Sequence, residues 1–118
     1  MKNQNKKTGA RLRLVLAGGQ ALGPGKADLL AAIATSGSLT AAAAELGMSY
    51  RRAWLLVEEM NGMFRGPVVQ TTKGGRGGGG QTGLTELGGE VLRLYRLAEE
   101  KTAAAINEEM RALRGVLK

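Results

Sequence analysis

The side chains of this sequence that are best suited to chemistry are cationic. Arg51 and Arg52 stand together shortly after Ser49, and Lys73 and Arg76 lie within a run of glycines. A guanidinium can pair with the edge of a guanine or with a phosphate oxygen, and a glycine backbone can approach a sugar–phosphate wall closely. The chain has 17 lysines and arginines against 10 aspartates and glutamates, a net charge of +7 that attracts polyanions. Nucleic acid is therefore the first partner to consider.

Other kinds of chemistry have little to be built from. The chain has no cysteine and no histidine, and Asp28 is its only aspartate. Disulfides, thiolate or imidazole metal ligands and nucleophiles served by histidine are excluded, and a catalytic pair of carboxylates is not expected. We therefore expect no catalytic residue, no metal site and no cofactor, and we predict that the protein is not an enzyme.

Two short helices are predicted to position Arg51 and Arg52. Ser38 is an N-cap candidate for the alanine-rich segment that ends at Gly47, and Ser49 is an N-cap candidate for the segment that follows. About three residues, including a glycine, separate the two helices, which is the spacing of a helix-turn-helix. On the second helix the residues expected to face the core are Ala53, Leu56, Val57 and Met60, and those expected to face outward are Arg51, Leu55, Glu58 and Glu59.

The segments before this pair are predicted to be one strand and one helix. Residues 11–16 alternate between polar and apolar, so their leucines are expected to share one face of a half-buried strand. The segment AGGQALGPGK that follows is typical of a turn. A helix with Pro24 at its start is then expected to continue until Gly37 stops it.

A β-hairpin and a long helix are predicted after the helix pair. VVQTT ends at Thr72 and TGLT follows the glycine run, so two short strands are expected to form a wing with a glycine-rich tip. Thr85 can cap the last helix, which is expected to continue towards Leu113. Residues spaced three or four apart form a seam on this helix, as in a coiled coil: Leu87, Val91, Leu94, Ala98, Thr102 and Ala105. We expect this seam to hold a homodimer.

The glycine run also suggests a nucleotide-binding loop, but its pattern does not fit one. Gly79 is followed by Gly80, Gln81 and Thr82, whereas a nucleoside triphosphate loop needs lysine and then serine or threonine. The dinucleotide-binding pattern needs a strand, a helix and a second strand around its glycines, and a hairpin is expected here instead. A flexible linker stays open as the alternative to a wing that contacts DNA.

Two aromatic residues of the second helix leave two interpretations open. Tyr50 and Trp54 lie about one turn apart on the same flank. They can prop the helix against its neighbour, or they can contact a thymine methyl group or a sugar of DNA. Leu55, on the exposed face, can likewise meet a methyl group.

The order of the predicted elements and three sequence segments resemble the N-terminal DNA-binding domain of the ModE family of molybdate-responsive regulators. The segments are GPGKADLLAAIATSGSLTAAAAELGMSYRRAWLLVEEMN, TTKGGRGGGGQTGLTELG and LYRLAEE. The resemblance implies a LysR-like winged helix-turn-helix with a recognition helix from Ser49 to Met60, a wing from Lys73 to Gln81 and a last helix that makes the dimer. Members that sense molybdate do so in C-terminal oxyanion-binding domains. Because the sequence ends at Lys118, we expect it not to sense molybdate itself.

The expected fold class is mainly α with a small β wing. It comprises a disordered basic tail over residues 1–10, a winged helix-turn-helix domain over 11–84 and a C-terminal dimerisation helix over 85–118. The expected function is sequence-specific binding of duplex DNA by a bacterial transcriptional regulator linked to molybdenum metabolism. The residues expected to contact DNA are Ser38, Thr40, Ser49, Tyr50, Arg51, Arg52, Trp54, Leu55, Thr72, Lys73, Gly75 and Arg76.

Two other functions stay open at this point. The protein could be an interaction module that partners a separate effector-sensing chain, or a general nucleic-acid binder without sequence preference. No apolar run approaches the roughly 20 residues needed to span a bilayer, and the N-terminus lacks the apolar centre of a signal peptide. A cytoplasmic location without membrane contact is therefore expected.

Overall fold

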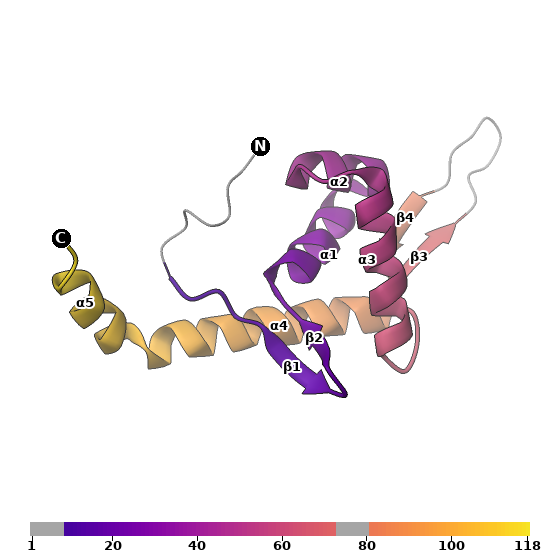
Figure 1. The fold of residues 1–118 in the computed structure, drawn as a ribbon. Helices are drawn as coiled ribbons and strands as arrows, with labels where there is room; N and C mark the ends of the chain where they lie inside the picture. The colour runs from indigo at the N-terminus through magenta and orange to yellow at the C-terminus, as the bar shows by residue number, and fades with distance from the viewer. Residues whose placement is uncertain (1–8, 73–80) are drawn as a thin grey trace.

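The computed structural model describes residues 9–72 and 81–118, which are mainly helical with two small antiparallel sheets (Figure 1). In chain order the elements are β1 (Leu14–Ala17), β2 (Gln20–Leu22), α1 (Pro24–Ser36), α2 (Leu39–Leu46), α3 (Tyr50–Met63), β3 (Val69–Thr72), β4 (Gln81–Leu84), α4 (Glu86–Ala105) and α5 (Asn107–Gly115). The prediction of a mainly α fold with a small β component is confirmed. Most of the tail predicted for residues 1–10, together with Lys73, Gly75 and Arg76, lies outside the described residues.

The first three helices begin and end at residues that suit helix termini. Pro24 opens α1, where its fixed φ fits the first turn and its missing amide is not needed. Gly37 and Gly47 end α1 and α2 with φ of +72° and +70°, values that glycine adopts without strain. The hydroxyl oxygens of Ser38 and Ser49 each accept a 3.1 Å hydrogen bond from a first-turn amide of α2 and α3. These boundaries agree with the sequence-based predictions.

The hydrophobic core is built around α1. Leu29, Leu30 and Ile33 of this helix are fully buried. α2 and α3 pack against it, α2 with the small buried side chains of Ala42 and Ala43, and α4 runs beneath α1 and behind the β1–β2 hairpin (Figure 1). The other buried core residues include Ala42, Ala43, Ala53, Leu56, Val57, Met60, Val68, Val69, Val91 and Tyr95.

The N-terminal strand has a partner strand that the sequence analysis assigned to a turn. Gly18 and Gly19, with φ of +56° and +82°, reverse the chain, and β2 pairs antiparallel with β1. Ala21 and Leu22 of β2 are buried, whereas Leu16 of β1 is 52% exposed. The prediction that the leucines of residues 11–16 share one half-buried face is therefore wrong at Leu16, because the register shifts between residues 15 and 17.

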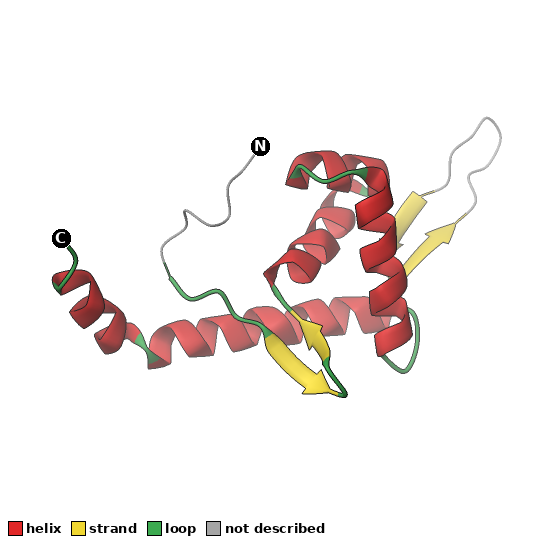
Figure 2. Ribbon diagram, viewed as in Figure 1, coloured by secondary structure: helices red, strands yellow, loops and turns green. Residues whose placement is uncertain are grey.

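The predicted last helix is divided into two (Figure 2). α4 ends at Ala105, and Ile106 has φ of −106° and ψ of 15°, outside the α-helical values, before α5 begins. The prediction of a single helix from Thr85 towards Leu113 is therefore wrong at this point. The break falls where the β-branched Ile106 is followed by Asn107, and both types have only modest helix propensity. Among the described residues, no helix has the length and apolar character needed to cross a membrane.

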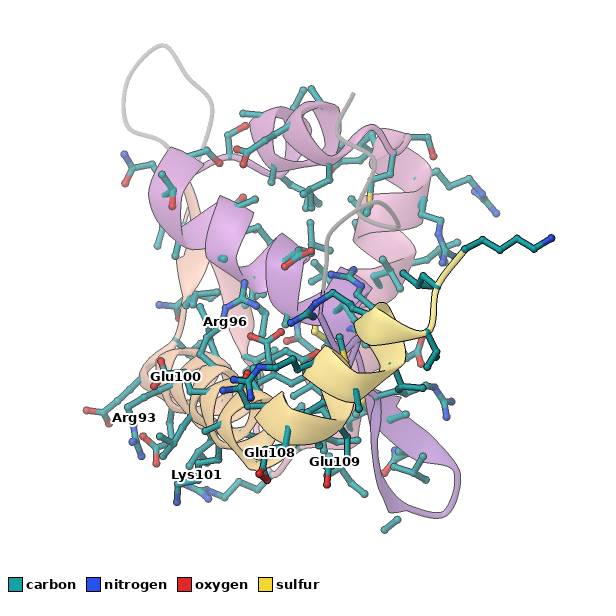
Figure 3. All side chains as sticks on the ribbon, turned by 90° about the vertical axis from the view of Figure 1, so that its left-hand side faces the viewer. Arg93, Arg96, Glu100, Lys101, Glu108 and Glu109 are labelled. Atoms are coloured by element: carbon teal, nitrogen blue, oxygen red, sulfur yellow. The ribbon has the colours of Figure 1, made fainter. Side chains whose placement is uncertain are left out.

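Polar contacts hold α4 against the N-terminal elements. The Tyr95 hydroxyl donates a 2.6 Å hydrogen bond to the Leu12 carbonyl oxygen. The Arg96 guanidinium bridges Asp28 of α1, at 3.1 Å, and Glu99, at 2.9 Å. Burial raises the pKa of the Tyr95 phenol above its ordinary value, and the nearby Glu99 carboxylate acts in the same direction. In Figure 3, Arg96 lies on the side of α4 towards α1, whereas Arg93 and Lys101 point away from the domain.

The first turn of α4 lies directly against the start of β3. The Val68 carbonyl oxygen accepts a 3.0 Å hydrogen bond from the Thr85 amide, and the Thr85 hydroxyl donates to the Pro67 carbonyl oxygen at 2.7 Å. A Cβ atom at Gly88 would overlap the Val68 carbonyl group, whereas one at Gly89 would meet nothing within 4 Å. Gly88 is therefore required by packing, although a glycine weakens a helix interior.

Alanine at each of the two adjacent glycines should have opposite effects on stability. Gly88→Ala should lower the free energy of unfolding by about 1–3 kcal/mol, because α4 must move away from Val68. Gly89→Ala should raise it by about 0.5–1 kcal/mol, because alanine favours the helix and the site is open. Urea unfolding of both variants measures the difference. Equal effects of the two substitutions would contradict the close contact.

Candidate nucleic-acid interface

The helix α3, which follows α2, presents an exposed face on the side away from the core. Three residues, Gly47, Met48 and Ser49, join the two helices. The inward face of α3 is buried as predicted, at Ala53, Leu56, Val57 and Met60. The outward face is exposed as predicted, at Arg51, Leu55, Glu58 and Glu59. The amphipathic pattern therefore fixes which side of α3 points away from the core.

The serines among the candidate DNA contacts position the helices. The Ser38 hydroxyl oxygen accepts from the Ala41 amide, and the Ser49 hydroxyl oxygen accepts from the Arg52 amide. Thr40 is exposed in the first turn of α2. Each serine thus holds a first helical turn in place through an acceptor that the amides would otherwise lack.

An apolar strip accompanies the cations on α3. Tyr50 and Trp54 are 54% and 46% exposed, and Leu55 is 44% exposed. None of the three belongs to the hydrophobic core. About half of each side chain is therefore accessible for contact with another molecule.

Arg51 and Arg52 are both exposed at the amino-terminal end of α3. Among the described residues, neither guanidinium forms a hydrogen bond or an ion pair. Glu59, which lines the same pocket as Arg52, pairs through its carboxylate with the Lys26 ammonium at 2.7 Å. Both guanidinium groups are therefore available to an anionic partner.

The β3–β4 hairpin is attached to the helices at two places. The Asn61 side-chain oxygen accepts from the Val68 and Val69 amides at 2.8 and 3.0 Å, and its nitrogen donates to the Val69 carbonyl oxygen at 3.2 Å. On the other strand, the Thr82 amide donates to the Gly37 carbonyl oxygen at 3.0 Å. The sequence analysis missed Asn61. The only local indication of its role is that asparagine, which has modest helix propensity, occurs near the end of a helix.

The predicted hairpin is present, and its tip is outside the described residues. Thr72 pairs with Gln81 at the end of the ladder, and its hydroxyl donates to the Gln81 carbonyl oxygen at 3.4 Å. Thr72 is exposed there. Lys73, Gly75 and Arg76, the other three candidate residues of this segment, belong to residues 73–80, which the structure does not describe.

The residues of the predicted dimer seam are not all on one surface. Val91 is only 7% exposed and belongs to the core of its own chain, and Leu87, Ala98 and Thr102 are partly buried. Leu94 and Ala105 are exposed, and so is Leu97, which the seam did not include. The exposed apolar flank of α4 is therefore displaced around the helix from the predicted seam.

No group of three or more acidic, histidine or cysteine side chains in the described ranges could hold a metal ion. The functional groups of this surface are guanidinium groups, two aromatic rings and the hydroxyl groups of the serines that cap α2 and α3. Such groups suit contact with phosphates and base edges.

The chain is similar in sequence to several known proteins. No family model matches the chain. The chain is 38% identical over 95 residues to the molybdenum-pterin-binding protein MopB of Rhodobacter capsulatus, a match that covers 80% of this chain and 35% of MopB. It is 37% identical over 81 residues to the molybdenum transport protein ModE of Herbaspirillum seropedicae, covering 69% of this chain and 30% of that protein.

A third relative carries a description that concerns DNA. The chain is 40% identical over 74 residues to the DNA-binding transcriptional dual regulator ModE of Escherichia coli K12, covering 63% of this chain and 28% of that protein. The chain therefore spans about a third of the length of the relatives that it matches.

The N-cap of α3 should contribute measurably to stability. Ser49→Ala should lower the free energy of unfolding by about 1 kcal/mol, because the Arg52 amide loses its acceptor. Thr35→Ala is the control, since Thr35 is exposed within α1 and donates only to the Ala31 carbonyl oxygen of the same helix. That change should shift stability by only a few tenths of a kcal/mol. Chemical denaturation measures the free energy of unfolding of both variants. If Ser49→Ala were as stable as Thr35→Ala, the capping role of Ser49 would be refuted.

Proposed function

The chain belongs to the ModE family along the segment that it shares with these proteins, and we propose that it is a sequence-specific DNA-binding regulator of transcription. In this proposal the α2–α3 pair is a helix-turn-helix of LysR type, α3 is the recognition helix, and the β3–β4 hairpin is a wing. The protein acts by binding duplex DNA and performs no catalysis.

The observation that carries the proposal is the exposed amino-terminal part of α3. Arg51 and Arg52 have no ionic partner among the described residues, and Tyr50, Trp54 and Leu55 extend the same surface. In helix-turn-helix proteins the amino-terminal residues of the second helix contact base edges in the major groove. An arginine there can pair with a guanine, and an apolar side chain can contact a thymine methyl group.

Two further contacts support the assignment of the hairpin as a wing. Asn61 joins β3 to the carboxyl-terminal half of α3, and Thr82 joins β4 to the residue that ends α1. The hairpin base is thereby held at a fixed place beside α3. A hairpin placed there can contact the sugar–phosphate backbone while α3 occupies the major groove.

We also propose a link to molybdenum metabolism and a homodimeric assembly. Relatives in the family are described as molybdenum-pterin-binding and molybdenum transport proteins, so genes for molybdenum handling are the proposed targets. The exposed apolar flank of α4, centred on Leu94 and Leu97, is the proposed dimer contact. A two-fold dimer would present two copies of α3 to a palindromic site.

Arg51 should contribute to sequence preference. Arg51→Ala should weaken binding to a duplex selected from a random library by about 1–3 kcal/mol, which is roughly 5- to 150-fold. Binding to a scrambled duplex should change much less, because a base contact is lost. Arg111→Ala, which removes the same charge from an exposed position of α5, is the matched control. Fluorescence anisotropy measures the affinities of the wild type and both variants for the two duplexes. If the Arg51 and Arg111 variants bound the selected duplex equally well, α3 would not be the recognition helix.

Leu94 should contribute to assembly. Leu94→Glu should shift the protein towards monomer at micromolar concentration, because a charge would be buried in an apolar contact. Ala103→Glu adds the same charge to an exposed position nine residues further on, which is about two and a half turns and therefore the opposite side of α4. It should leave assembly unchanged. Sedimentation equilibrium distinguishes the two variants, and an unaltered mass for Leu94→Glu would exclude this flank as the dimer contact.

A further inference from the structure

A positively charged pocket opens between α3, the β1–β2 hairpin and the start of α1. Its volume is about 310 Å³, and its lining includes Arg13, Lys26 and Arg52, each from a different part of the chain, together with Glu59. Arg13 precedes β1, Lys26 lies in the first turn of α1, and Arg52 lies in the first turn of α3. In Figure 1 the hairpin and α3 both lie in front of α4.

Two of the three cations in this pocket have no carboxylate partner among the described residues. The Lys26 ammonium donates to Glu59 at 2.7 Å and to the Ala21 carbonyl oxygen at 2.8 Å, so these opposite charges largely offset one another. Within the described ranges, the guanidinium groups of Arg13 and Arg52 have no carboxylate partner. The remaining charge of the pocket is therefore that of two guanidinium groups. A guanidinium group donates several hydrogen bonds and therefore suits a tetrahedral oxyanion such as a phosphate.

The pocket lies on the opposite flank of α3 from the β3–β4 hairpin. Arg52, Leu56 and Glu59 line it from positions four and three residues apart, which share one side of a helix. Asn61, which binds β3, is nine residues after Arg52, about two and a half turns away and so on the other side. A helix in a major groove has one sugar–phosphate backbone on each side. The hairpin is suited to one of them and the pocket to the other.

We propose that this pocket binds a backbone phosphate of the duplex that α3 occupies, with Arg13 and Arg52 as the phosphate contacts. The inference rests on the proposed function and assigns different roles to two adjacent arginines. Arg51 contacts base edges, whereas Arg52 acts with Arg13 to hold the backbone and so fixes the position of α3 in the groove. Phosphate contacts of this kind add affinity without sequence preference.

The dependence of DNA affinity on salt tests the proposal. Arg13→Ala and Arg52→Ala should each reduce the slope of log affinity against log chloride concentration by about 0.9, the value expected for one phosphate contact. Each should weaken binding to the selected and the scrambled duplex by the same factor. Arg111→Ala should leave the slope unchanged. Because the stem of Arg13 lies beside Gly23, Arg13→Lys is included to keep both the stem and the charge, and it should retain the wild-type slope.

Titration with inorganic phosphate distinguishes a DNA backbone from a free oxyanion as the occupant. If calorimetry detected saturable phosphate binding that Arg13→Ala abolished, while the DNA slope of that variant stayed at the wild-type value, the pocket would be a free-anion site and the proposal would be overturned. If the wild type bound the selected duplex but Arg13→Ala and Arg52→Ala had the same salt slope as Arg111→Ala, the pocket would not bind a backbone phosphate. The proposed function would stand in that case. If the wild type bound no selected duplex, the proposed function itself would fail.

Discussion

The arrangement of the domain depends on the close contact between Gly88 and the Val68 carbonyl group. Val68 is fully buried, and its carbonyl oxygen also accepts the Thr85 amide at the start of α4. The amides of Val68 and Val69 donate to the side-chain oxygen of Asn61 of α3. One short segment of backbone is therefore fixed between α3 and α4, and it sets the orientation of one helix relative to the other. In the dimer proposed above, that orientation would determine how far apart two copies of α3 lie and hence which spacing of half-sites they could occupy.

Local sequence signals were enough to predict the helix pair. Ser38 and Ser49 cap because their hydroxyl oxygens reach an amide three residues ahead, and Gly37 and Gly47 end helices because they adopt positive φ. Each of these signals acts within a few residues and does not depend on the rest of the fold. The buried stripe of α3 was predictable for the same reason, since helical periodicity alone determines which side chains share a face.

Features that depend on distant contacts were not predictable from the sequence. β2 forms because burial of Ala21 and Leu22 outweighs the turn-like composition around them. Val91 faces the core of its own chain because the contact of Gly88 with the Val68 carbonyl group sets the rotation of α4 about its axis. The spacing of apolar residues along the helix does not reveal that rotation. The pocket beside α3 joins Arg13, Lys26 and Arg52 from three separate elements. Arg51 and Arg52, predicted as one feature from their adjacency, consequently face different surroundings.

The hydrogen bond from Tyr95 to Leu12 has a consequence for the order in which the chain can fold. Its two partners are 83 residues apart, so the segment before β1 cannot form this hydrogen bond with α4 until most of the chain has been synthesised. Contacts of such long sequence separation form late, because a large loop must close before they provide any stabilisation. During that interval, α1, α2 and α3 are stabilised only by contacts of short and medium sequence separation. Folding on the ribosome should therefore begin with these three helices and be completed cooperatively only after α4 has emerged.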